Sequence, residues 1–183
     1  MKIILKLSFV LLSSLFFNAK VFSQNKQEQK SKEIHWVSIE EAEKLNKKEP
    51  RKIFIDLYTN WCGWCKRMDA TTFQDPFIVN YLNNKYYAVK FNAETRDTIN
   101  FNGKTFIFKP ELRANEFAYT VMQGQIKGYP TSVYLDEHFT VLTSVASFLT
   151  AEQIEPLLKY FGEGDYKKMN WDNYQQNFKG EVH

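Results

Sequence analysis

Apolar runs alternate along the chain with stretches in which apolar residues recur every three or four positions. The run KIFIDLY at residues 52–58 is nearly continuous, which is typical of a strand that is covered on both faces. Other β-prone runs occur before and after it. Together they predict strands at residues 35–37, 52–58, 86–92, 128–135 and 139–145, with the last two joined by a turn into a hairpin.

Capping residues and apolar periodicity predict helices between these strands. Ser38, with Glu41 three residues later, forms a capping box before one helix. Asp75 followed by Pro76 is a good start for another. The stretch WCGWCKRM should open a helix directly after the first long strand. Apolar residues at helical spacing predict two more helices, at residues 114–122 and 154–161.

Two features bear on the helices predicted in the C-terminal third of the chain. Pro156 falls inside the last predicted helix, where a proline costs about 3 kcal/mol, so we expect the helix to begin at Pro156 with Glu155 as its N-cap. Beyond it, three aromatic residues recur at i, i+3 and i+7: Trp171, Tyr174 and Phe178. This spacing predicts a short helix within an aromatic tail, residues 162–183, that docks on the rest of the protein.

The sequence TINF-NG-KTFIF predicts an additional β-hairpin at about residues 98–108. Asn102–Gly103 suits a type I′ turn between two β-prone runs. The order of elements is then β–α–β–α–β, the extra hairpin, a helix, a second hairpin and more helix. This order predicts an α/β domain built around one sheet.

The N-terminus has the pattern of a secretory signal peptide. Lys2 and Lys6 form a short basic region, and residues 7–17 are an apolar run of eleven. Val21 and Ser23 fit the positions three and one before a cleavage site, which predicts that residues 1–23 are removed after Ser23. We therefore expect a secreted or periplasmic protein.

Removal of the leader affects both membrane anchoring and the net charge of the protein. Its apolar run is shorter than the roughly 20 residues that span a membrane, so we expect no stable membrane anchor after cleavage. Residues 24–33 are polar throughout and predict a flexible tether. Cleavage removes three lysines and no acidic residue, so the net charge falls from +3 to 0. A neutral chain without a basic cluster gives no electrostatic reason to bind nucleic acid.

Cys62 and Cys65 are the two cysteines of the sequence and lie in the stretch WCGWC. A disulfide across four residues stabilises a protein by roughly 2 kcal/mol, against nearly 5 for a loop of 100 residues. At the start of a helix, the free N–H groups and the helix dipole stabilise a thiolate. The pair therefore favours thiol–disulfide exchange, with Cys62 as the attacking thiolate and Cys65 as the resolving thiol.

The cysteine pair has two alternative uses. The pair could form a redox-inert disulfide in a binding module, which would predict a bond resistant to mild thiols. A zinc site would need about two more ligands, and the histidines His35, His138 and His183 do not lie at ligand spacing to the pair. No metal is predicted.

Asp56 and Lys90 each place a charge inside an apolar strand. Such a charge is costly unless it is paired or put to use. If the two strands are neighbours, the side chains can pair beneath the cysteines. We hypothesise that Asp56 accepts the proton of Cys65 when a mixed disulfide is resolved and that Lys90 tunes it. The alternative is two ordinary strand residues with solvated tips.

Four motifs resemble those of the thioredoxin family. FIDLYTNWCGWCK resembles the active-site stretch, which usually has an aspartate in an apolar strand followed by WCGPCK. GYPT resembles the turn with a cis-proline opposite the dithiol, which matches Pro130, and AVKFNAE resembles the strand that carries the lysine, here Lys90. The DxxTF segment from Asp69 to Phe73 is similar to that of an exported bacterial branch with CGWC. The similarity covers residues 34–161.

The resemblance implies a thioredoxin-like α/β fold with a central mixed β-sheet flanked by helices, into which the hairpin at about 98–108 is inserted. It also implies an exported thiol–disulfide oxidoreductase that needs no cofactor, because the dithiol is itself the redox centre. The expected partners are proteins with cysteines or disulfides and, for a reductase, a membrane electron donor. The matches of Asp56 and Lys90 favour the reductase direction, and an oxidase or isomerase is the alternative.

The resemblance places substrate contacts around the cysteine pair, at Trp61, Gly63, Trp64, Tyr129 and Pro130. Two of these residues depart from the family pattern: Trp64 replaces a proline and Tyr129 replaces a smaller aliphatic residue. The reduction potential and the choice of substrate therefore do not follow from the resemblance.

Overall fold

The computed structural model describes residues 32–182. The predicted signal peptide and all but the last two residues of the predicted tether lie outside this range. Five strands form the central sheet of the described residues, in the order β1-β3-β2-β8-β9. Their bounds are β1 Trp36–Val37, β2 Lys52–Tyr58, β3 Tyr86–Asn92, β8 Thr131–Leu135 and β9 Val141–Ala146. All five strands agree with the sequence-based prediction to within a few residues.

The sheet is mixed, as predicted. β2 runs parallel to β3 and antiparallel to β8. The C-terminal end of β2 and the N-terminal end of β8 therefore lie next to each other at the same end of the sheet. The segment that leaves β2 at Tyr58 carries the two cysteines, and the segment that enters β8 at Thr131 carries Pro130. The register places Asp56 opposite Lys90 on one side and opposite Ser132 on the other.

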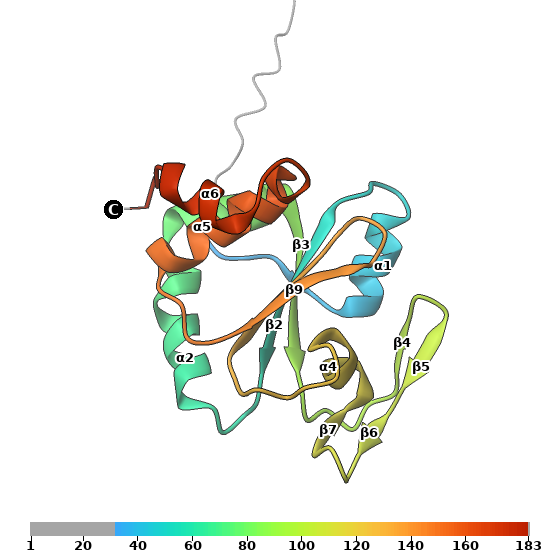
Figure 1. The fold of residues 1–183 in the computed structure, drawn as a ribbon. Helices are drawn as coiled ribbons and strands as arrows, with labels where there is room; N and C mark the ends of the chain where they lie inside the picture. The colour runs from blue at the N-terminus through green and yellow to red at the C-terminus, as the bar shows by residue number, and fades with distance from the viewer. Residues whose placement is uncertain (1–31, 183) are drawn as a thin grey trace, which may run out of the picture.

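Helices cover both faces of the sheet (Figure 1). Helices α1, Ile39–Asn46, and α4, Glu116–Val121, share one hydrophobic cluster with Ile53, Ile55 and Leu57 of β2. Helices α2, Gly63–Ala70, α3, Pro76–Lys85, and α5, Ala151–Gly162, share the other cluster with Phe54. Because side chains alternate along a strand, Asp56 faces the same side as Phe54, which is the side of α2.

Short elements connect the main ones. A single 3₁₀ turn, η1 at Thr72–Gln74, lies between α2 and α3. Ser38 caps α1 by accepting a hydrogen bond from the N–H of Glu41, and Asp75 caps α3 by accepting from the N–H groups of Phe77 and Ile78. Both capping residues were predicted from the sequence.

The segment between β3 and α4 holds the predicted hairpin. β4, Ile99–Phe101, pairs with β5, Lys104–Phe106, across a turn in which Asn102 and Gly103 both have positive φ. These are the conformations that a type I′ turn requires. A second small ladder follows, β6 at Phe108–Lys109 with β7 at Ala114–Asn115. Figure 1 shows both ladders beside α4, away from α2 and α5.

Two predicted helix starts were wrong. The helix expected from Ala114 begins at Glu116, because Asn115 caps it by accepting from the N–H of Phe117 and Ala114 pairs within β7 instead. The helix expected to begin at Pro156 begins at Ala151 and contains the proline. The side-chain oxygen of Gln153 accepts from the N–H of Thr150 at this start. The early start buries Ile154 together with Leu158, Phe161 and the proline itself, which offsets the hydrogen bond that Pro156 cannot donate.

The C-terminal segment contacts α5. It contains a 3₁₀ turn, η2 at Asp165–Lys167, and α6 at Trp171–Asn177. The ring of Tyr160 lies 5.3 Å from that of Trp171 and 4.9 Å from that of Tyr174. The buried carboxylate of Glu155 accepts from the N–H groups of Glu181 and Val182 at 2.7 and 3.1 Å. The division into a domain ending at 161 and a separate tail stays a prediction.

A search of residues 32–182 for membrane-spanning helices found none that is both apolar and long enough.

Candidate functional site

The cysteine pair lies where β2 gives way to α2. Cys62 is the N-cap of α2, with extended backbone angles, and its Sγ accepts a hydrogen bond from the N–H of Cys65 at 3.0 Å. The two sulfurs form a disulfide with an S–S distance of 2.05 Å. A sulfur thus takes the capping position in which serine or aspartate oxygens are usually found.

This position determines how the pair can react. When the disulfide is reduced, the Cys62 sulfur still faces the free N–H groups and the positive end of the α2 dipole, both of which stabilise a thiolate. The Cys65 sulfur follows one turn later, and both cysteines are buried, with 4% of Cys62 and 2% of Cys65 exposed. The position at the helix start favours Cys62 as the nucleophile, and its role as the attacking thiolate stays a prediction.

Two exposed tryptophans flank the buried pair. Trp61 is 68% exposed and Trp64 is 58% exposed, and both are among the few large apolar side chains at the surface of the described residues. Gly63 lies between Cys62 and Trp64, and a Cβ added there would meet no atom within 4 Å. The surface around the disulfide is therefore apolar and open.

Trp61 connects the cysteine segment to the segment that enters β8. Its indole Nε1–H donates to both carboxylate oxygens of Glu94 at 3.0 Å. Its ring meets the ring of Tyr129 edge-on, with the centroids 6.2 Å apart. Burial, together with the Glu94 carboxylate, raises the pKa of Tyr129 to about 12. Tyr129 is joined by a cis peptide bond to Pro130, which is buried.

Trp64 packs on the other side of the pair. Its ring lies 5.3 Å from that of Phe148, in the segment between β9 and α5. The guanidinium of Arg67, one turn along α2, lies 5.8 Å from the centroid of the Trp64 ring. The five residues predicted to contact substrate thus divide into two groups, with Trp61, Tyr129 and Pro130 on one side and Trp64 on the other, and Gly63 between them.

Asp56 and Lys90 form the predicted ion pair. The Lys90 Nζ donates to Asp56 Oδ2 at 2.7 Å and also to Asp69 Oδ1, on α2. Asp56 is 1% exposed. The rings of Trp36 and Tyr58 lie close to the ammonium group, each with its centroid at 5.1 Å. The ion pair therefore joins the centre of the sheet to the helix that carries the cysteines.

Burial raises the pKa of the Asp56 carboxyl from its ordinary value of 3.8 to about 6, against the opposing effect of Lys90. Burial also lowers the pKa of Lys90, but its two carboxylate partners raise it by more, so the ammonium stays charged. The second oxygen of Asp56, Oδ1, accepts no hydrogen bond from any described residue. Asp56 is thus a buried carboxyl with one unbonded oxygen, on the face of the sheet that α2 covers.

Three side chains of the site were not predicted as such. Asp69 was noted only as part of the DxxTF segment, and its position one turn beyond Cys65 on α2 was the available indication that it reaches Lys90. Glu94 lies two residues beyond the end of β3, the strand that carries Lys90. Phe148 comes from a distant part of the chain, and nothing in its local sequence indicates that it packs on Trp64.

No group of three or more histidine, cysteine, aspartate or glutamate side chains is arranged to hold a metal ion within the part of the chain that the structure describes.

A family model for the thioredoxin-like domain matches residues 39–162, more than half of the chain. The chain belongs to this family. The sequence is also similar to two proteins named thiol:disulfide interchange protein DsbD. That of Pectobacterium atrosepticum is 25% identical over 118 residues and that of Haemophilus ducreyi is 28% identical over 115. These matches cover 62% and 61% of this chain, but only 17% of either relative.

Among solved structures, a thioredoxin from Thermus thermophilus superposes with a TM-score of 0.51 at 16% identity. The superposition covers 81% of this chain and 99% of the other. This likeness concerns the fold. The thioredoxin-like α/β fold predicted from the sequence is confirmed, and within it the Cys62–Cys65 disulfide lies at the start of α2.

Proposed function

We propose that the protein is an exported thiol–disulfide oxidoreductase that acts as a reductase of protein substrates. The observation that carries the proposal is the position of the cysteine pair: a disulfide that caps a helix N-terminus, between two exposed tryptophans, in a thioredoxin-like domain. A disulfide with a structural role has no use for an exposed apolar surface around it. The names of the DsbD relatives support thiol–disulfide chemistry.

The first step is attack by the Cys62 thiolate on one sulfur of a substrate disulfide. A mixed disulfide forms between Cys62 and the substrate, and the other substrate sulfur leaves as a thiolate and takes up a proton. The exposed rings of Trp61 and Trp64 border the place where the substrate must lie. Tyr129 directly precedes Pro130 at the entry to β8, and its backbone would pair with an extended substrate segment, as in strand addition.

The second step resolves the mixed disulfide. Cys65 loses its proton to the Asp56 carboxylate and attacks the Cys62 sulfur, which releases the second substrate sulfur as a thiolate that takes up a proton from water. The substrate thus gains two electrons from the Cys62–Cys65 pair and two protons from the solvent, Asp56 returns its proton to the solvent, and the protein is left with its disulfide. The raised pKa of Asp56, about 6, fits a base that accepts a proton near neutral pH. Lys90 would hold the ionised carboxylate in place.

The oxidised pair must then be reduced again by an outside dithiol. For an exported protein, a membrane partner that carries electrons across from the cytoplasm fits this role. The same residues would run the reaction backwards as an oxidase if the disulfide were the less stable state, and an isomerase would break one substrate disulfide and form another with no net transfer of electrons.

Cysteine variants test the exchange reaction. The reduced protein should reduce a disulfide-bonded protein such as insulin, and Cys62→Ser should abolish this activity. Cys65→Ser should accumulate a mixed disulfide with the substrate, visible on a non-reducing gel and absent from the Cys62→Ser variant. Activity retained in Cys62→Ser would refute the role of Cys62 in the exchange. No reaction of the wild-type protein with any disulfide would leave a redox-inert binding module.

A further inference from the structure

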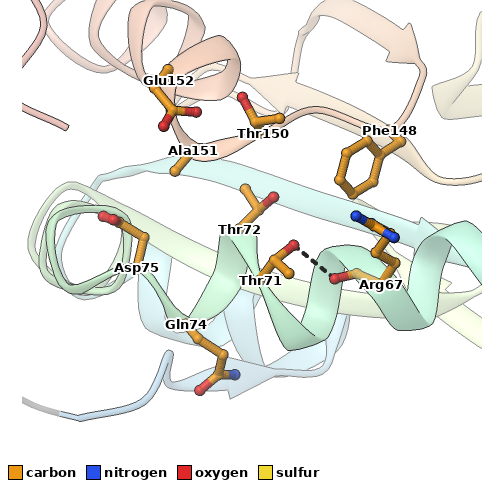
Figure 2. Close-up of a pocket in the computed structure, with 9 residues that line it drawn as sticks. All are labelled: Arg67, Thr71, Thr72, Gln74, Asp75, Phe148, Thr150, Ala151 and Glu152. Atoms are coloured by element: carbon orange, nitrogen blue, oxygen red, sulfur yellow. Dashed lines mark hydrogen bonds between the residues drawn. The ribbon is translucent and has the colours of Figure 1, made fainter. Parts of the chain in front are cut away.

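A groove runs along the C-terminal part of α2, and neither Trp61 nor Tyr129 is among the residues that line it. It has a volume of about 450 Å³ and lies between α2, the start of α3 and the start of α5. Figure 2 shows Arg67 and Phe148 together at one end and Asp75 and Glu152 toward the other. Phe148 also packs on Trp64, so the Arg67 end of the groove adjoins the surface around the disulfide.

Arg67 is an exposed cation without a carboxylate partner. Its guanidinium is held over the Trp64 ring, and its backbone carbonyl accepts from the hydroxyl of Thr71 at 2.8 Å. Among residues 32–182, no aspartate or glutamate oxygen lies within ion-pair distance of the guanidinium. The guanidinium is therefore free to bind an anionic group of another molecule.

The two carboxylates of the groove lie at the opposite end. Asp75 is occupied by the N–H groups of Phe77 and Ile78, which it caps. Glu152 lies in the first turn of α5. An acidic group that enters the groove is thus attracted at the Arg67 end only, next to Trp64 and the disulfide.

We propose that Arg67, Trp64 and Phe148 form a subsite that selects protein substrates with an acidic residue two or three positions from the reacting cysteine. This inference rests on the proposed exchange reaction and adds a substrate class to it. Arg67 follows Cys62 by five residues, which corresponds to about 7.5 Å along the helix axis. An extended substrate segment covers roughly 3.3 Å per residue, so a side chain two or three residues from the cysteine reaches the guanidinium.

Synthetic peptides test the subsite. Each peptide contains one cysteine, joined by a disulfide to 2-mercaptoethanol, and carries Asp, Asn or Lys two or three residues away. Reduced protein donates two electrons to each mixed disulfide and releases the peptide thiol and 2-mercaptoethanol. Every rate is divided by the rate of the same variant with uncharged 2-hydroxyethyl disulfide, which corrects for changes in the reactivity of Cys62.

The wild-type protein should reduce the Asp peptide about fivefold faster than the Lys peptide, which is the size expected for one exposed ion pair. Arg67→Glu should reverse this preference. At 1 M salt, where the Debye length is about 3 Å, the preference should largely disappear. Lys85→Glu is the matched control: Lys85 is exposed and ends α3 at the opposite edge of the sheet, so the same change in net charge should leave the preference intact.

The outcomes separate the two claims. If the wild-type protein reduces all peptides at equal normalised rates, or if Arg67→Glu keeps the preference for Asp, the subsite is refuted while the exchange function stands. If neither the peptides nor 2-hydroxyethyl disulfide are reduced, the proposed function itself fails and the subsite with it.

Discussion

Asp56→Asn should make the oxidised protein more stable at neutral pH, because burial destabilises the ionised form of the Asp56 carboxyl. The pKa of Asp56 is raised from 3.8 to about 6. Well below pH 3.8 the carboxyl is protonated in both the folded and the unfolded protein and has no effect. Above pH 6 it is ionised in both, and the shift of about two units lowers the free energy of unfolding by about 3 kcal/mol. The contribution of Asp56 to the free energy of unfolding of the wild-type protein is therefore lost as the pH rises from about 4 through 6.

Asp56→Asn also buries an amide, and the cost of that burial does not change with pH. Comparing the stability change caused by Asp56→Asn at two pH values therefore isolates the effect of the ionised carboxylate. Linkage gives a penalty of about 3 kcal/mol at pH 8 and about 0.5 kcal/mol at pH 4. The stability gained by Asp56→Asn should therefore be about 2.5 kcal/mol larger at pH 8 than at pH 4. Urea unfolding followed by tryptophan fluorescence at the two pH values measures it.

Asp172→Asn is the control for the loss of one negative charge. Asp172 is exposed on α6, so its replacement should change the stability by less than about 0.5 kcal/mol at either pH. A gain for Asp56→Asn that is the same at pH 4 and pH 8 would refute the reasoning, since it would mean that the buried carboxyl has an ordinary pKa.

Three further predictions concern the proton acceptor, the tail and the substrate surface. The rate of substrate reduction should rise through about pH 6 as Asp56 ionises; Asp56→Asn should remove this step and Lys90→Met should move it to higher pH, which a stopped-flow pH series would measure. Glu155→Gln replaces a charged acceptor of two backbone N–H groups by a neutral one, so the C-terminal segment should lose about 1–2 kcal/mol of local stability. Hydrogen exchange measured by mass spectrometry should then show faster exchange of the amide hydrogens in this segment. Trp61→Phe removes the hydrogen bond to Glu94, and steady-state kinetics should find a severalfold higher KM for insulin with little change for 2-hydroxyethyl disulfide; an unchanged KM would exclude Trp61 from substrate binding.

The parts of the fold that were predictable are those in which local sequence and tertiary packing favour the same structure. The strand at 52–58 is apolar because both faces are covered, and the Asn102–Gly103 turn is specified by the two residues that tolerate its backbone angles. The start of α5 was missed because the rule against interior proline is local. Tertiary burial of Ile154 and Leu158 outweighs it, and no local pattern reports that burial.

The candidate site likewise has parts that the sequence predicts and parts that it does not. Asp56 and Lys90 could be paired in advance because a charge in an apolar strand needs a partner, and sequential strands are often neighbours. Asp69 and Arg67 could not be separated from the other charges of an exposed helix surface. The partners of Trp61 and Trp64, which are Glu94, Tyr129 and Phe148, come from three distant segments. Only the folded chain brings these residues together.

The reduction potential of the Cys62–Cys65 pair tests the central claim most directly. The purified protein would be equilibrated with defined ratios of reduced and oxidised dithiothreitol and, for higher potentials, of reduced and oxidised glutathione. The tryptophan fluorescence would report the fraction of disulfide, since Trp61 and Trp64 flank the pair. A reductase predicts a potential near −270 mV, as in thioredoxin. A potential of about −120 to −180 mV would contradict the reductase and indicate an oxidase or isomerase.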